Sequence, residues 1–128
     1  MREIKFRVFT KEKNRLVYPE WITFFKDFAE FRVKEEYGYT IYRPSYKDID
    51  IMQYTGLKDK NGIKIYEGDI VLWIDSYGNE RKDKVFFESG GFRINNPLFE
   101  IADYDELEVI GNICETPKLL KEEKEYEY

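Results

Sequence analysis

The chain has 128 residues and a mass of 15.6 kDa, the usual size of a single domain with a substantial core. Hydrophobic residues make up 42% and aromatic residues 18%, more than a disordered chain carries, and the 37% of charged residues supply a polar surface. Histidine is absent and Cys114 is the single cysteine. This composition excludes Ser-His-Asp and Cys-His catalysis, a zinc site of the usual Cys/His type and an intrachain disulfide.

The formal net charge of −5 is divided unevenly along the chain. Residues 1–64 carry 14 Lys and Arg against 10 Asp and Glu, hence +4, and residues 65–128 carry 7 against 16, hence −9. Such an asymmetry can mark a binding face, but much of the acid lies in residues 118–128, which is typical of a solvated tail. No signal-peptide pattern and no stretch of about 20 apolar residues is visible, so we expect a cytoplasmic protein that does not contact the membrane.

Residues 1–48 are predicted to form a small β-rich lobe. Residues 3–9 alternate apolar and polar side chains with a period of two, which indicates a half-buried strand, and residues 16–18 return as its hairpin partner. Two more strands are expected at residues 29–34 and 38–42, separated by a turn.

The stretch over residues 20–28 allows two interpretations. Its aromatic and β-branched side chains favour a strand. Pro19 and the helical spacing of the aromatic side chains favour a short helix or turn instead. We predict the short helix or turn.

Residues 49–117 are predicted to form an SH3-like, partly open small barrel, which makes the chain mainly β with sparse α+β character. Asn61-Gly62 is the strongest two-residue hairpin signal, because both positions of a type I′ turn need positive φ. The apolar run at residues 70–74 predicts a strand that is buried on both sides. Further elements are expected at these positions: strands at 84–88, 92–95 and 108–114, and one helical turn at 103–107.

Three segments, residues 51–62, 65–71 and 109–113, closely resemble the signature of the YopX family, small proteins encoded by phages and prophages of Gram-positive bacteria. The opening residues 3–7 are also similar to the family's N-terminus. The resemblance implies a phage or prophage source and a cytoplasmic accessory role, and it implies no catalytic residue. The signature residues are Tyr54, Gly56, Leu57, Asp59, Gly62, Tyr66, Gly68, Asp69, Gly111 and Asn112.

Turn chemistry explains this signature without an active site. Gly56, Gly62 and Gly68 stand where turns need positive φ or a close backbone approach. The carboxylate of Asp69 is expected to accept backbone N–H bonds at the entry to the buried strand. Gly111, inside the last strand, indicates a bulge or a barrel corner.

Acidic side chains are the remaining candidates for metal binding or acid–base chemistry. They occur as Asp48 with Asp50, Glu67 with Asp69, and Asp103 with Asp105 and Glu106. The last group does not have the spacing of an EF-hand loop, and helix capping and solvated loops account for all three. We therefore predict no metal, no cofactor and no enzymatic activity.

The function expected from these features is a non-enzymatic binding module that acts on a protein partner and forms a homo-oligomer through aromatic-rich β surfaces. Nucleic-acid binding is the alternative, because the N-terminal hairpin interleaves basic and aromatic residues. The sequence pI of about 5.0 opposes it. The basic residues of this candidate surface are Arg2, Lys5, Arg7, Lys11, Lys13 and Arg15.

Overall fold

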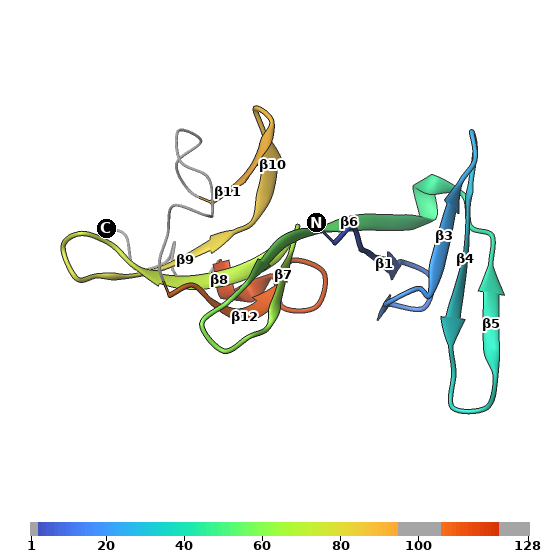
Figure 1. Ribbon diagram of the computed structural model, residues 1–128, viewed down its shortest axis with the longest axis horizontal. Coiled ribbons are helices and arrows are strands. Elements are labelled where there is room, and N and C mark those ends of the chain that lie inside the picture. The colour runs from blue at the N-terminus through green and yellow to red at the C-terminus, as the bar shows by residue number, and fades with distance from the viewer. Residues whose placement is uncertain (1–2, 95–105, 121–128) are drawn as a thin grey trace. The chain divides into compact units, whose positions relative to one another are not determined.

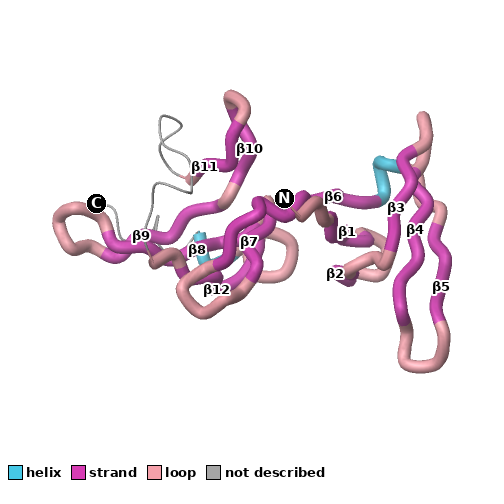
Figure 2. Tube along the Cα trace, viewed as in Figure 1, coloured by secondary structure: helices cyan, strands magenta, loops and turns pink. Residues whose placement is uncertain are grey.

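The computed structural model describes residues 3–94 and 106–120, and strands dominate this part of the chain (Figures 1 and 2). Helical backbone in the described ranges is confined to the 3-10 turn Tyr46–Asp48 and to residues 118–120. The predicted fold class, mainly β with a partly open small barrel, is confirmed, and the barrel sheet is curled.

The chain divides into two compact units. One comprises Ile4–Gln53, and the other comprises Glu3 together with the described residues from Tyr54 onward. The predicted boundary between residues 48 and 49 coincides with the start of strand β6 (Ile49–Lys58). The boundary between the two compact units lies inside that strand, between Gln53 and Tyr54.

In the first unit, β1 (Phe6–Thr10) pairs antiparallel with β2 (Arg15–Val17) on one side and with the first half of β6 on the other. Val8 stands opposite both Val17 and Ile51, and its side chain is fully buried. The period-two pattern of residues 3–9 therefore predicted the strand and its hairpin correctly.

A second sheet in this unit has the order β3-β4-β5. It is built from β3 (Trp21–Phe24), β4 (Ala29–Lys34) and β5 (Tyr39–Tyr42). The helix or turn predicted over residues 20–28 is wrong where β3 lies. The aromatic and β-branched side chains there form a strand because pairing with β4 satisfies its backbone, and the chain turns through Phe25, whose N–H donates to the Phe28 carbonyl at 2.9 Å.

The core of this unit lies against one face of the β3-β4-β5 sheet. Its buried members are Val8, Val17, Ala29, Phe31, Val33 and Ile49. Phe31 is completely buried and stacks on Tyr42 with ring centroids 5.3 Å apart. The hydroxyl of Tyr46 donates to the carbonyl of Phe25, which fixes the β3–β4 turn against the 3-10 turn.

The second unit is also built of short antiparallel strands. They are the end of β6, β7 (Lys64–Tyr66), β8 (Asp69–Ile74), β9 (Glu80–Lys84), β10 (Phe86–Glu88), β11 (Gly91–Arg93) and β12 (Glu108–Asn112). A three-stranded sheet has the order β12-β8-β9. Strands β10 and β11, which follow β9 in the chain, form a separate two-stranded hairpin. The buried cluster of this unit consists of Ile65, Val71, Val85, Phe92, Ile94 and Leu107.

Several details of the second unit differ from expectation. Strand β8 is buried only as far as Val71, and Ile74 is 59% exposed, so burial on both sides is limited to its first half. The charged segment Glu80–Lys84 is a strand that no apolar pattern indicated, because its pairing with β8 and not side-chain burial defines it. Asn95 and residues 103–105 of the predicted elements lie outside the described residues.

The predicted type I′ turn at Asn61-Gly62 is also wrong. Gly62 has φ +81°, but Asn61 does not have positive φ. The Asp59 carbonyl accepts the Gly62 N–H at 3.0 Å, and the Asp59 N–H donates to the Ile63 carbonyl at 2.7 Å. The loop is therefore longer than a two-residue turn, and it contains a single residue in the left-handed region.

Candidate binding surface

Alternation in β4 separates the two faces of the β3-β4-β5 sheet. Ala29, Phe31 and Val33 are buried, whereas the intervening residues point to the opposite face. Residues directly opposite one another in neighbouring strands share a face, so the registers place the rest of this surface. We define the outer face as Trp21, Thr23, Glu30, Arg32, Lys34, Tyr39 and Ile41.

Arg32 lies at the centre of the outer face. Trp21 of β3 and Ile41 of β5 stand directly opposite it on its two sides. Its guanidinium carbon lies 4.7 Å from the centroid of the Tyr39 ring, and its Nε donates to Glu20 Oε1 at 2.9 Å. The cation–π contact and the ion pair restrain this long side chain.

The apolar side chains around Arg32 are accessible to solvent. Trp21 is 37% exposed, Ile41 38% and Tyr39 59%. Tryptophan, tyrosine and arginine are the residues most enriched among the energetically dominant positions of protein interfaces. No single-sequence pattern indicated this surface, because three strands in a particular register assemble it.

The basic residues predicted for the N-terminal hairpin do not form one surface. Arg7 is buried, at 3% exposure, and its Nη2 lies 3.7 Å from Met52 Sδ. Lys11 donates to the Lys47 carbonyl at 3.1 Å and lies 3.9 Å from Asp50. The remaining positions are as follows: Lys5 is exposed, Lys13 lies 5.4 Å from the centroid of the Tyr42 ring, Arg15 pairs with Glu35, and Arg2 lies outside the described residues.

Arg15 and Glu35 form a two-pronged pair between β2 and the β4–β5 turn. The two guanidinium nitrogens lie 3.4 and 3.2 Å from the two carboxylate oxygens. Hydrogen bonding to Arg15 lowers the pKa of Glu35, and the same hydrogen bond raises the pKa of Arg15. Much of the positive charge of the hairpin is therefore matched by acid within the same unit.

Asp59 of the family-like signature holds two distant segments together. Its Oδ1 accepts the backbone N–H groups of Asn61 at 2.8 Å and Ile63 at 2.9 Å, and its Oδ2 accepts that of Val109 in β12 at 2.9 Å. Burial would raise the pKa of Asp59, but these three donors outweigh burial and hold it below its ordinary value. The role of this carboxylate is structural.

Asp69 and Gly68 fix the entry to β8. Asp69 is 2% exposed and its Oδ2 accepts the Tyr66 N–H at 2.8 Å, which confirms the expected backbone hydrogen bonding. Gly68 has φ +84°, its N–H donates to the Val85 carbonyl, and its carbonyl accepts the Ile113 N–H. This turn connects three segments of the second unit.

Gly111 and Asn112 shape the end of β12. The pairing with β8 shifts register between Val109 and Gly111, which confirms the predicted bulge. A Cβ atom at Gly111 would overlap Thr116 Oγ1 and would lie 2.8 Å from Leu119 Cδ1. The Oδ1 atom of Asn112 accepts the N–H groups of Cys114 and Glu115, so its side chain folds the chain back after the strand.

The other signature residues support the β6–β7 pairing. Tyr54 and Tyr66 are buried, and their ring centroids lie 5.5 Å apart. Gly56, with φ +88°, falls where the register of β6 shifts, and the N–H of Leu57 donates to Thr55 Oγ1 at 3.2 Å. The signature is thus mostly a set of turn and packing residues.

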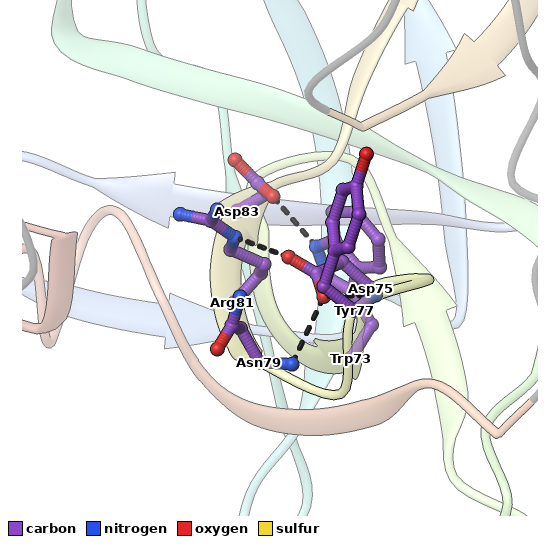
Figure 3. Close-up of polar contacts among 6 residues, drawn as sticks. All are labelled: Trp73, Asp75, Tyr77, Asn79, Arg81 and Asp83. Atoms are coloured by element: carbon purple, nitrogen blue, oxygen red, sulfur yellow. Dashed lines mark hydrogen bonds and ion pairs between the residues drawn. The ribbon is translucent and has the colours of Figure 1, made fainter.

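The β8–β9 turn, whose polar contacts are drawn in Figure 3, has the same hydrogen-bond pattern as the Asp59 loop. The Oδ1 atom of Asp75 accepts the N–H groups of Tyr77 and Asn79, both at 2.9 Å, and its Oδ2 accepts Arg81 Nε at 3.0 Å. Hydrogen bonding to Asn79 lowers the pKa of Asp75. Both loops read Asp-x-x-Gly-x, with Gly62 and Gly78 in the left-handed region, a spacing that sequence inspection could have identified.

Beside this turn, Trp73 Nε1 donates to Asp83 Oδ2 at 2.6 Å. A cavity of about 880 Å³ lies along the same strands, lined by Lys60, Leu72, Trp73, Ile74, Glu80, Glu106 and Glu108. Lys60 and Glu108 in its wall are 3.5 Å apart. In residues 3–94 and 106–120, no group of three Asp, Glu or Cys side chains is placed to hold a metal ion.

Comparison with known proteins identifies the family. The family described as "YopX protein" matches residues 5–121 of this sequence. The chain belongs to the YopX family. A similar solved structure, protein EF1440 from Enterococcus faecalis, has a TM-score of 0.66 at 24% identity, and the match covers 94% of this chain and 99% of that one. The likeness to EF1440 establishes a shared fold.

Among proteins with curated descriptions, no match was found. Within the described residues, no helix of this YopX family member has the length and apolar character needed to cross a membrane.

Proposed function

We propose that this YopX family member is a phage- or prophage-encoded accessory protein of the bacterial cytoplasm, a non-enzymatic module whose outer face binds a protein partner. The observation that carries the proposal is the row formed by exposed Trp21, half-buried Arg32 and exposed Ile41, with exposed Tyr39 beside it. These side chains are rigid or held by contacts within the sheet, so little conformational entropy is lost when a partner covers them.

The arginines on and beside the outer face are paired with acidic side chains, which favours a protein over a nucleic acid as the binding partner. Arg32 pairs with Glu20, and Arg43, which follows β5, pairs with Glu30 at 2.5 Å. A nucleic-acid surface needs cations that remain available to phosphates. Base stacking on Trp21 and Tyr39 is the specific feature that keeps nucleic acid as the second candidate.

Two features support a non-enzymatic role. The chain contains no histidine, the commonest general base. The carboxylate of Asp59 accepts three backbone N–H groups, which hold its pKa below its ordinary value. Hydrogen bonds of this kind favour the ionised form, the opposite of what a general acid near neutral pH requires.

We also propose that the chain forms a homo-oligomer. The first unit, residues 4–53, carries 10 Lys and Arg against 8 Asp and Glu, hence +2, and the rest of the chain carries 11 against 18, hence −7. The basic excess of the first unit is thus small. Attraction between unlike units supports self-association weakly, and the aromatic surfaces of the sheet support it more strongly.

The test is capture of proteins from a bacterial lysate by the wild-type chain, Trp21→Ala and Tyr77→Ala, each with and without nuclease. Tyr77 is 89% exposed in the β8–β9 turn, so Tyr77→Ala is the matched control for losing an exposed aromatic side chain. Wild type and Tyr77→Ala should retain the same protein after nuclease, and Trp21→Ala should lose it. Equal retention by all three chains contradicts the proposed surface. Retention that nuclease abolishes and that weakens steeply with salt favours nucleic acid.

A further inference from the structure

The edge of β5 that faces away from β4 lacks the charged or proline residues that usually prevent pairing at an exposed strand edge. In the sheet order β3-β4-β5, no described strand pairs with this edge, which is free in the ribbon view (Figure 1). Residues 38–42 read Gly-Tyr-Thr-Ile-Tyr, with no charge and no proline. By contrast, the edge strand β9 reads Glu-Arg-Lys-Asp-Lys. Charged edges prevent pairing between molecules, and an uncharged edge permits it.

The hairpin geometry shows which backbone groups β5 presents at this edge. The Glu35 N–H donates to the Gly38 carbonyl at 3.0 Å across the β4–β5 turn. Hydrogen-bonded and non-hydrogen-bonded pairs alternate along an antiparallel ladder, so Thr40 bonds to Val33 while the N–H and C=O groups of Tyr39 and Ile41 point away from β4. Two donors and two acceptors therefore face outward.

We propose that β5 pairs antiparallel with β5 of a second copy of this chain, about a two-fold axis that passes through Thr40. The inference rests on the proposed self-association and specifies its interface. In this register Tyr39 of each copy lies opposite Ile41 of the other, and the two residues exchange hydrogen bonds. Both are outer-face residues, so the pairing makes two aromatic–aliphatic contacts and extends the sheet from three strands to six.

The charges that flank β5 favour this antiparallel arrangement. Glu36 precedes the strand and Arg43 follows it. Antiparallel pairing about Thr40 sets Arg43 of each copy opposite Tyr37 of the other, whose ring is 90% exposed and can accept a guanidinium over its face, whereas parallel pairing would set Arg43 beside Arg43 and Glu36 beside Glu36. The edge is thus complementary to itself, which points to a second copy of this chain as its occupant.

The opposite edge of the sheet is less suited to this role. Strand β3 also lacks charge, but Phe24 at its end packs edge-on against Phe6 of β1, with ring centroids 5.4 Å apart. We therefore assign the interface to β5.

A cross-linking experiment tests the register directly. In a Cys114→Ala background, Thr40→Cys should form an intermolecular disulfide with oxidised glutathione, which accepts the two electrons and two protons released by the thiols. Residues opposite each other in a non-hydrogen-bonded pair have Cα atoms about 4.5 Å apart, within disulfide range. Thr23→Cys, on the β3 edge, is the matched control and should remain reduced. No cross-link at residue 40, or an equal one at residue 23, overturns the proposal.

Light scattering of the full chain over a range of protein concentrations gives the independent readout. The wild type and Trp21→Ala should be dimeric, and Ile41→Lys should be monomeric with an unchanged circular dichroism spectrum. A monomeric wild type overturns both the interface and the proposed self-association. An oligomer that persists in Ile41→Lys overturns the β5 interface alone. If Trp21→Ala stays dimeric but no longer captures the partner, the dimer interface and the partner-binding surface are distinct.

Discussion

Replacing Asp59 by asparagine should destabilise the chain far more than the isosteric change suggests. The amide keeps one oxygen, which can still accept from Asn61 and Ile63, but its NH2 group then faces the Val109 N–H. One charge-assisted hydrogen bond is lost and a buried donor is left without an acceptor, which together cost about 2–4 kcal/mol in the free energy of unfolding. For a chain of this size the melting temperature falls by roughly 10 °C.

Asp75→Asn is the matched control, because the same turn geometry surrounds it and its second oxygen faces the Arg81 side chain instead of a backbone donor. Its loss of stability should be clearly smaller, since a flexible guanidinium near solvent can find water. The assay is urea unfolding followed by tryptophan fluorescence, combined with hydrogen exchange of the Val109 amide. Equal destabilisation by the two variants, or an unchanged exchange rate at Val109, would refute this account of Asp59.

The deficit of Asp59→Asn should also depend on pH with a defined sign. The folded-state pKa of Asp59 lies below its ordinary value, so its carboxylate stabilises the fold above about pH 4, the value for the unfolded chain. That contribution is lost as the pH falls through the folded-state pKa. The difference in stability between wild type and Asp59→Asn should therefore be full at pH 7 and shrink toward pH 3. A difference that grows on acidification contradicts the assignment.

Three further predictions address packing and charge. Gly111→Ala should lower the free energy of unfolding by about 1–3 kcal/mol in a urea titration, because the added methyl group overlaps Thr116. An unchanged free energy of unfolding would contradict the close packing of Thr116 against Gly111. Phe31→Ala should cost about 3–5 kcal/mol by the same measurement, since its side chain is completely buried, and a loss below 1 kcal/mol would contradict its place in the core. A double-mutant cycle on Arg15 and Glu35 should give a favourable coupling that fades in 1 M salt, and a coupling that is insensitive to salt would exclude a solvent-accessible ion pair.

The sequence by itself determined the local parts of this fold. Alternating apolar residues and polar turns specify the β1–β2, β4–β5 and β10–β11 hairpins, because each needs only neighbouring residues and a short turn. The buried acceptor Asp69 and the bulge before Gly111 were predictable for the same reason, since each satisfies or bends the backbone close to its own position.

Tertiary structure decided what depends on residues far apart. Residues 21–24 form a strand because β4 is available to pair with them, which overrides the helical spacing of their aromatic side chains.

The binding surfaces depend on such distant pairings too. The basic hairpin is not one surface, because Arg7 packs on Met52, 45 residues away, and Arg15 pairs with Glu35, 20 residues away. The outer face exists only once β3, β4 and β5 are in register, and the uncharged pattern of β5 becomes an open edge only when β4 lies on its other side. A side chain's face and partners follow from strand pairing, which short-range periodicity does not specify.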